Sequence, residues 1–295
     1  MIVARIFGGL GNQMFQYAAG RALAIRHGTE LALDLRMFRS YALHAYGLSR
    51  FRIRVATVQE RPSRLPGRAT LALAARLPPG LLRSCYLEHP FGNRTSWECV
   101  AADAYISGYF QGEFYLREAA DYLRDEFLPV AAFGAKNDAA AGLMADCESV
   151  AVHVRRGDYV SDQSTLDIHG VCSIGYYQAA VDLLRRRLNR PRFFVFSNDF
   201  AWARNHLALG DDAVFVDWNA NAPELDLHLM SRCRHHVIAN STFSWWAAWL
   251  AGHPGQIVVT PDPWFDSVAL DDSGLLPDHW LRIGKSAPTV NVGHP

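Results

Sequence analysis

The sequence predicts an α/β protein with two domains, and three observations lead to this prediction. The chain has 295 residues, which is enough for two domains of about 100–150 residues each. Its second half alternates short apolar runs with helical stretches, the pattern of a parallel sheet with helices on both faces. The first 33 residues already show a β–loop–α–β order.

The first domain begins with a strand, a turn and a helix. Residues 2–7 alternate and include β-branched side chains, which favours a strand. The glycine-rich segment 8–11 then makes a tight turn, and residues 12–27 place apolar side chains at helical spacing. The other elements expected in this half are strands at 31–33 and 104–109 and helices at 70–77 and 115–127.

A linker at 129–148 separates the two domains, because this stretch combines proline, glycine and an alanine-rich run. Its start can hold a short helix. The expected boundary divides the chain into residues 1–135 and 136–295. The elements expected beyond the linker alternate strictly: strand 149–154, helix 174–189, strand 193–196, helix 200–207, strand 213–216, helix 222–233, strand 236–239, helix 242–251 and strand 256–259.

Composition excludes several classes of protein. Basic and acidic residues number 29 each, so the chain lacks the positive excess of a dedicated nucleic-acid binder. The five cysteines are widely spread without a C-x-x-C pair, which argues against disulfides and zinc and favours a reducing, cytoplasmic setting. We find neither a signal peptide nor an apolar run long enough for a transmembrane helix. Any membrane association is therefore expected to be peripheral, at the inner face.

Residues 50–83 differ from their surroundings, since they hold eight arginines and one glutamate among several prolines. The plainer interpretation is a solvated connection with a basic face. The sharper hypothesis is a peripheral contact with anionic lipid headgroups or with an acidic acceptor.

The segment HVRRGDY, residues 153–159, directly follows a buried β-branched run. Ligands of parallel α/β sheets bind at the carboxyl ends of strands. Arg155 and Arg156 at such a position can hold a phosphate or diphosphate by bidentate hydrogen bonds. Asp158 places a carboxylate, and hence a candidate base, beside them. The alternative is a surface turn with a weak local ion pair.

Two further loops follow predicted strands. Asn198 and Asp199 can hydrogen-bond a nucleobase or ribose, and they can equally cap the next helix. The loop 217–219 is interpreted as a plain connection before a helix.

The segment after the strand at 236–239 predicts an anion site. Asn240 or Ser241 should cap the helix that follows, whose first turn offers free N–H groups and the positive end of the helix dipole. Thr242 and Ser244 add hydroxyl donors beside Ser241. The tryptophans of this helix are expected to fill the core: Trp245, Trp246 and Trp249.

The N-terminal turn permits two interpretations. Gly9 and Gly11 lack the third glycine of a dinucleotide fingerprint, and a lone G-x-G is weak evidence. Asn12 and Gln13 can cap the helix or present neutral amides to a sugar phosphate. No H-E-x-x-H motif and no Asp-x-Asp after a strand points to a metal. Arginine and a helix dipole are then expected to balance the charge of a leaving group.

Together these segments resemble the bacterial α-1,2-fucosyltransferases of glycosyltransferase family 11. The resemblance spans most of the chain and is weakest at residues 50–100 and in the last 30. No single block is specific, but the combination is. The matching blocks, in order, are GGLGNQMFQYAAGRALA (8–24), HVRRGDY (153–159), HGVCSIGYYQAAV (169–181), FSNDFAWAR (196–204) and NSTFSWWAAWL (240–250).

The resemblance implies two Rossmann-like domains facing a cleft, the GT-B fold, with residues 1–135 on the acceptor side and 136–295 binding the donor. It implies GDP-L-fucose as donor, a β-galactoside glycan as acceptor, and metal-independent transfer with inversion, without a cofactor. The expected setting is the assembly of a surface glycan such as an O-antigen.

The resemblance also implies residue roles. Arg155 contacts the donor diphosphate, Asn12 lies near the reacting centre, and Asp199 binds guanine or ribose. Asp158 is the first candidate for the general base and His153 the second. The expected donor-binding set is Gly11, Asn12, Gln13, Arg155, Arg156, Asn198, Asp199, Asn240, Ser241, Thr242, Phe243 and Ser244.

Three alternatives stay open at this point. The first is a fucosyltransferase of another linkage or acceptor. The second is a nucleotide-sugar or glycan-binding protein without turnover. The third is a dehydrogenase, against which the missing third glycine weighs.

Overall fold

The structure is a computed structural model that describes residues 1–40, 43–58, 84–88, 94 and 96–288, without the side chains of residues 158 and 161. The helix expected at 70–77 and most of the basic segment 50–83 lie outside the described residues. The proposed membrane contact of that segment therefore stays a prediction. Among the described helices, none is both long and apolar enough to span a bilayer.

The chain forms two compact units. The first comprises Met1–Val130 and Leu270–Asp278, and the second comprises Ala131–Ala269 and His279–Pro295. The predicted linker holds a helix, α4 (Ala135–Ala145), which belongs to the second unit. The boundary expected between residues 135 and 136 thus falls inside this helix.

The first unit is built on a parallel five-stranded sheet of order β3-β2-β1-β5-β4. Helix α1 (Leu10–Arg26) packs closely on it, because a Cβ at Gly20 would come within 2.9 Å of the Ala4 side chain. Only glycine permits this approach without a shift. The strands are β1 (Ile2–Arg5), β2 (Leu31–Asp34), β3 (Ala56–Val58), β4 (Cys85–Leu87) and β5 (Tyr105–Ser107).

The helix expected at 115–127 is only partly correct. Residues 113–119 form two short 3-10 turns, and the α-helix, α3 (Ala120–Glu126), begins after them. The edge strands β3 and β4 were not predicted, since each has three residues and pairs on one side only. The other short 3-10 turns of this unit are at Arg36–Arg39, Leu48–Arg50 and Trp97–Cys99.

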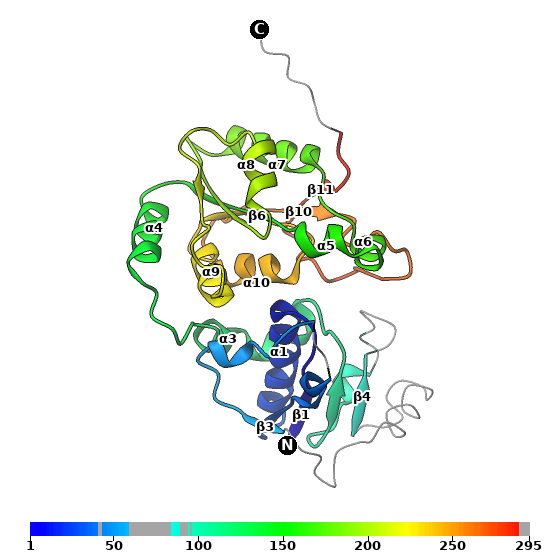
Figure 1. Ribbon diagram of the computed structural model, residues 1–295. Helices are drawn as coiled ribbons and strands as arrows, with labels where there is room; N and C mark the ends of the chain where they lie inside the picture. Colours follow the sequence, from blue (N-terminus) through cyan, green and yellow to red (C-terminus); the bar gives the residue numbers. More distant parts are fainter. Residues whose placement is uncertain (41–42, 59–83, 89–93, 95, 289–295) are drawn as a thin grey trace. The chain divides into compact units, whose positions relative to one another are not determined.

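The second unit has a parallel six-stranded sheet of order β11-β10-β9-β6-β7-β8. Helices α7 and α8 lie on one face and α9 and α10 on the other (Figure 1). The strands are β6 (Ser149–Val154), β7 (Arg192–Ser197), β8 (Val214–Phe215), β9 (His235–Val237), β10 (Val258–Asp262) and β11 (Leu281–Gly284). The helices are α5 (Gly157–Ser161), α6 (Gln163–His169), α7 (Ile174–Arg187), α8 (Phe200–His206), α9 (Pro223–Met230) and α10 (Thr242–Ala251).

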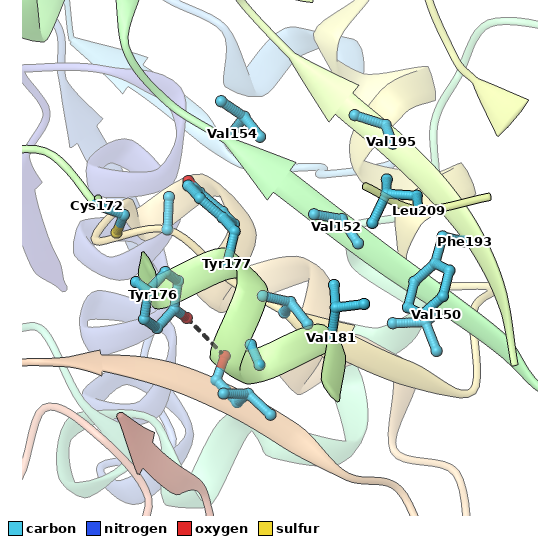
Figure 2. Packing of buried hydrophobic residues seen from close by; sticks show 14 of the residues in the cluster. Val150, Val152, Val154, Cys172, Tyr176, Tyr177, Val181, Phe193, Val195 and Leu209 are labelled. Atoms are coloured by element: carbon cyan, nitrogen blue, oxygen red, sulfur yellow. Dashed lines mark hydrogen bonds between the residues drawn. The ribbon is translucent and has the colours of Figure 1, made fainter. Parts of the chain in front are cut away.

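The core of the second unit lies between the sheet and α7 (Figure 2). Val152 of β6 and Phe193 of β7 meet Tyr177 and Val181 of α7 there. Tyr176 donates its hydroxyl to the carbonyl oxygen of Ile238 at 2.6 Å, so its polar end is satisfied inside the core. Two parallel, Rossmann-like units confirm the predicted α/β class, while the cleft between them stays a prediction.

Candidate active site

Three of the predicted loops start at one edge of the second sheet. Strands β9, β6 and β7 are neighbours and run parallel. The loops that follow them begin at residues 155, 198 and 238. Carboxyl ends of adjacent parallel strands share one edge, where α/β proteins bind ligands. The arginine loop therefore lies between the other two.

Asn198 braces the arginine loop. Its Oδ1 accepts hydrogen bonds from the backbone nitrogens of Arg156 at 2.9 Å and Gly157 at 3.3 Å. A Cβ at Gly157 would lie 2.8 Å from Asn198 Nδ2, so any larger residue here would displace the Asn198 side chain. Asn198 thus fixes the backbone from which both arginines project. Its predicted contact with the donor stays a prediction.

Each arginine lies against an aromatic ring of the same unit. The guanidinium carbon of Arg156 is 4.3 Å from the centroid of the Trp202 ring, and that of Arg155 is 5.6 Å from the Tyr159 ring. Cation–π contacts of this kind hold a guanidinium in place. Two oriented positive charges at a strand end suit a diphosphate.

The structure describes only one of the two candidate bases, His153, with its side chain. The side chain of Asp158 lies outside the described residues. His153 is buried, and its Nδ1 has no hydrogen-bond partner among the residues that the structure describes. Burial and the neighbouring Arg155 lower the pKa of His153 to about 3. A base whose pKa lies so far below neutrality is a poor proton acceptor.

Asp199 caps helix α8. Its Oδ1 accepts from the backbone nitrogen of Trp202 at 3.0 Å, and its own nitrogen donates to Ser197 Oγ at 2.8 Å. The capping alternative is therefore confirmed. Contact with guanine or ribose stays a prediction, for which the second carboxylate oxygen would serve.

The residues at the start of α10 differ in their burial. Asn240 is buried and donates from Nδ2 to the carbonyl of His169 at 2.6 Å. Ser244 is buried and donates to the carbonyl of Ser241 at 3.2 Å. Thr242 and Phe243 are half-buried, and Phe243 lies 5.7 Å from the His153 ring, centroid to centroid. Within the described residues, the N-cap Ser241 makes no side-chain capping bond.

The N-terminal turn in the first unit does not use its amides as caps. Helix α1 begins at Leu10, so Asn12 and Gln13 lie inside its first turn, and the capping alternative is wrong. Gln13 is fully buried and donates to the carbonyls of Gly8 at 2.8 Å and Ala45 at 2.9 Å. It is an internal brace of the turn.

Asn12 is oriented by a residue that the sequence analysis missed. Its Oδ1 accepts from Gln111 Nε2 at 2.8 Å, and Gln111 is buried. The bond fixes the orientation of the Asn12 amide. No local pattern signals this pairing, because 99 residues separate the two positions. Gly11 is also buried.

The loop after β8 carries a buried polar network instead of a plain connection. Asn219 donates from Nδ2 to Asp226 Oδ1 at 2.9 Å, and Trp218 donates to Asn137 Oδ1 at 2.8 Å. Asn219 and Asn137 also bond to each other. Burial is the main cause that raises the pKa of Asp226 to about 6, with neighbouring Glu224 adding to it.

Asp226→Asn is expected to stabilise the protein above pH 6 by about 1–2 kcal/mol. The folded pKa lies above the usual value, so the folded state holds the proton more tightly. The stability contributed by Asp226 is therefore lost as the pH rises from about 4 to about 6. Asparagine keeps the acceptor for Asn219 without the charge. Urea unfolding at pH 5.0 and 8.0 measures the difference, which should be larger at pH 8.0. An equal difference at both values would contradict the assignment.

Sequence comparisons identify the family of the chain. The family model "Glycosyl transferase family 11" matches residues 85–283. An α-1,2-colitosyltransferase of Escherichia coli is 35% identical over 97% of this chain and 99% of its own length. The O-antigen biosynthesis glycosyltransferase WbnK of Escherichia coli is 30% identical, over 94% of this chain and 98% of its own. Galactoside α-(1,2)-fucosyltransferase 1 of Oryctolagus cuniculus is 30% identical, over 97% of this chain and 74% of its own.

The matched range contains the arginine loop and the loops beside it, and the match to the first relative extends over nearly the whole chain. The protein therefore belongs to glycosyltransferase family 11.

Proposed function

We propose that the protein transfers L-fucose from GDP-L-fucose to the 2-hydroxyl of a β-galactoside in an O-antigen-like glycan precursor. The observation that carries the proposal is the arginine loop at the end of β6, braced by Asn198 and joined to the start of α10. A hydrogen bond connects the two segments: the Tyr159 hydroxyl donates to the Asn240 carbonyl at 3.3 Å. Arg155 and a helix N-terminus can then act on one diphosphate.

These groups would stabilise the leaving group. Negative charge grows on GDP as the bond to fucose breaks, and oriented positive groups in a water-poor site stabilise it best. The acceptor hydroxyl attacks from the opposite side, which inverts the anomeric centre. Asp158 takes its proton, because this carboxylate follows Arg155 by three residues in the same loop. Asn12, held by Gln111, donates its amide near the sugar. No metal ion takes part in this scheme.

A second donor is favoured by one observation. The relative with 35% identity is a colitosyltransferase, and colitose is L-fucose without its 3-hydroxyl. A pocket that binds colitose rejects fucose only weakly if it is apolar at that position, whereas a pocket that bonds the 3-hydroxyl strongly rejects colitose. The ratio of kcat/KM for the two GDP-sugars therefore decides between them.

The test begins with isothermal titration of GDP, GDP-fucose and GDP-mannose. Product analysis with a β-galactoside acceptor follows, with GDP-fucose and GDP-colitose compared as donors. An α-1,2-linked fucosyl product is the expected result, and it should form equally well in excess EDTA. A preference for GDP-colitose would replace the donor. Binding without product on a panel of galactosides would favour a non-catalytic binding protein, and a product of another linkage would correct the position. Reversible loss of activity in EDTA would overturn the metal-free scheme.

A further inference from the structure

Lys285 is a buried cation that the proposed mechanism does not use. It directly follows β11 and is 1% exposed. Its Nζ pairs with Asp266 Oδ1 at 2.6 Å and donates to the carbonyls of His169 at 2.7 Å and Trp264 at 3.3 Å. Burying an ammonium group is costly unless such partners surround it. The family match ends two residues earlier, at 283.

Lys285 and Asn240 bind the same two carbonyl groups. Asn240 Nδ2 donates to the carbonyl of His169 at 2.6 Å and to that of Trp264 at 3.3 Å. Asn240 is itself 1% exposed and precedes α10. The end of α6, the segment after β10 and the start of α10 are thus tied together at one buried point.

From this point, contacts lead to Arg155. The His169 ring stacks on the Tyr159 ring, with 5.0 Å between centroids and 20° between planes. Tyr159 also donates its hydroxyl to the Asn240 carbonyl at 3.3 Å, and its ring lies 5.6 Å from the guanidinium carbon of Arg155. The Tyr159 ring therefore stacks on His169, which Lys285 contacts, and its hydroxyl bonds Asn240, which shares two carbonyl partners with Lys285.

We propose that Lys285 is a positioning residue of the donor site, which sets the place of the Arg155 guanidinium through His169 and Tyr159. The proposal rests on the proposed function, in which Arg155 binds the donor diphosphate. Lys285 does not touch the donor in this scheme. It acts on GDP affinity and on the donor KM, and it leaves the acceptor KM unchanged.

The main experiment is isothermal titration of GDP into the full-length wild type, Lys285→Met and Arg282→Met. Methionine keeps the length of the side chain and removes the charge. Arg282 lies on β11, three residues before Lys285, and pairs with Asp262 at 3.9 Å, so its variant is the control for the loss of a nearby positive charge. We expect Lys285→Met to bind GDP about tenfold more weakly, and Arg282→Met to bind like the wild type.

A double-mutant cycle tests the route. If Lys285 acts through Tyr159, the Lys285→Met/Tyr159→Leu double variant should bind GDP about as weakly as Tyr159→Leu alone. Independent effects would instead multiply, and that result would overturn the route. A purely structural lysine would lower the melting temperature and leave the GDP affinity of the folded protein unchanged, which would overturn the proposal.

A second pair of variants leaves the buried charge in place, in case Lys285→Met does not fold. Tyr159→Phe removes the bond to Asn240 and should weaken GDP binding, whereas Tyr176→Phe loses a similar hydroxyl bond away from Arg155 and should not. Equal affinities for both would contradict the proposal. If the wild type itself binds no GDP, the proposed function fails instead, so the two failures are distinguishable.

Discussion

Arg155→Ala is expected to lower kcat about 10²–10³-fold, the scale of removing one preorganised charge-stabilising donor. The guanidinium lies at the carboxyl end of β6 and is held over the Tyr159 ring. Its loss removes positive charge where negative charge develops on GDP. Arg155→Lys should recover only part of the activity, because an ammonium group keeps the charge and loses the planar fork. Steady-state kinetics with varied donor measure both variants.

The control for this prediction is Arg185→Ala. Arg185 also lies over an aromatic ring of the second unit, with its guanidinium carbon 5.5 Å from the Phe193 centroid, but it projects from α7. Its replacement should leave kcat within about twofold, as for a surface group without a role in the site. Wild-type activity in Arg155→Ala would remove the arginine loop from the mechanism.

Trp246→Ala is expected to destabilise the protein by about 3–5 kcal/mol, as for other fully buried large aromatic residues. Trp246 is 0% exposed and packs edge-on against Trp245 and Trp249, with centroids 5.2 and 5.4 Å away. These contacts confirm the prediction that the tryptophans of α10 pack in the core. Alanine leaves a cavity that the rigid neighbours cannot fill.

Urea unfolding followed by circular dichroism measures this loss. Trp246→Phe keeps an aromatic ring and should lose less than half as much as the alanine variant. Val268→Ala, at a fully exposed side chain, should stay within about 0.5 kcal/mol of the wild type. A loss below about 1 kcal/mol in Trp246→Ala would show that the site collapses around the missing ring.

The central strands could be read from the sequence because they are buried on both faces. Val150, Val152, Phe193 and Val195 all face the core or the sheet interior, so β6 and β7 appear as continuous apolar runs. Strand β11 was missed, since it is an edge strand of four residues with alternating exposure. Helices α5 and α6 were also missed. The N-cap Asp162, which accepts from Ser164 N, was the available signal for α6.

In the candidate site, too, the sequence predicted positions that depend on local sequence and missed contacts between distant residues. The sequence sufficed to predict that Arg155 follows the end of a buried strand, because this position depends only on local sequence and sheet topology. The partners that decide what a side chain is free to do lie far along the chain. Asn240 is bonded to His169, Asn12 to Gln111, and Lys285 to His169. No periodicity or motif encodes such pairs, so the roles of Asn240 and Ser244 as ligand donors could not be tested from sequence.

The segment Leu270–Asp278 belongs to the first unit although β10 and β11 of the second unit flank it. Arg94 holds it there by donating to the Gly274 carbonyl at 2.8 Å. A chimera between two relatives must therefore keep residues 270–278 and the first unit from the same parent. A chimera cut only at Val130 would combine residues 1–130 of one parent with residues 270–278 of the other. Gly112 lies against the Gly274 carbonyl, so this contact would then join residues from different parents. Exchange of the first unit between family members therefore requires three crossovers, one after Val130 and one at each end of 270–278, so that this segment moves with the unit to which it belongs.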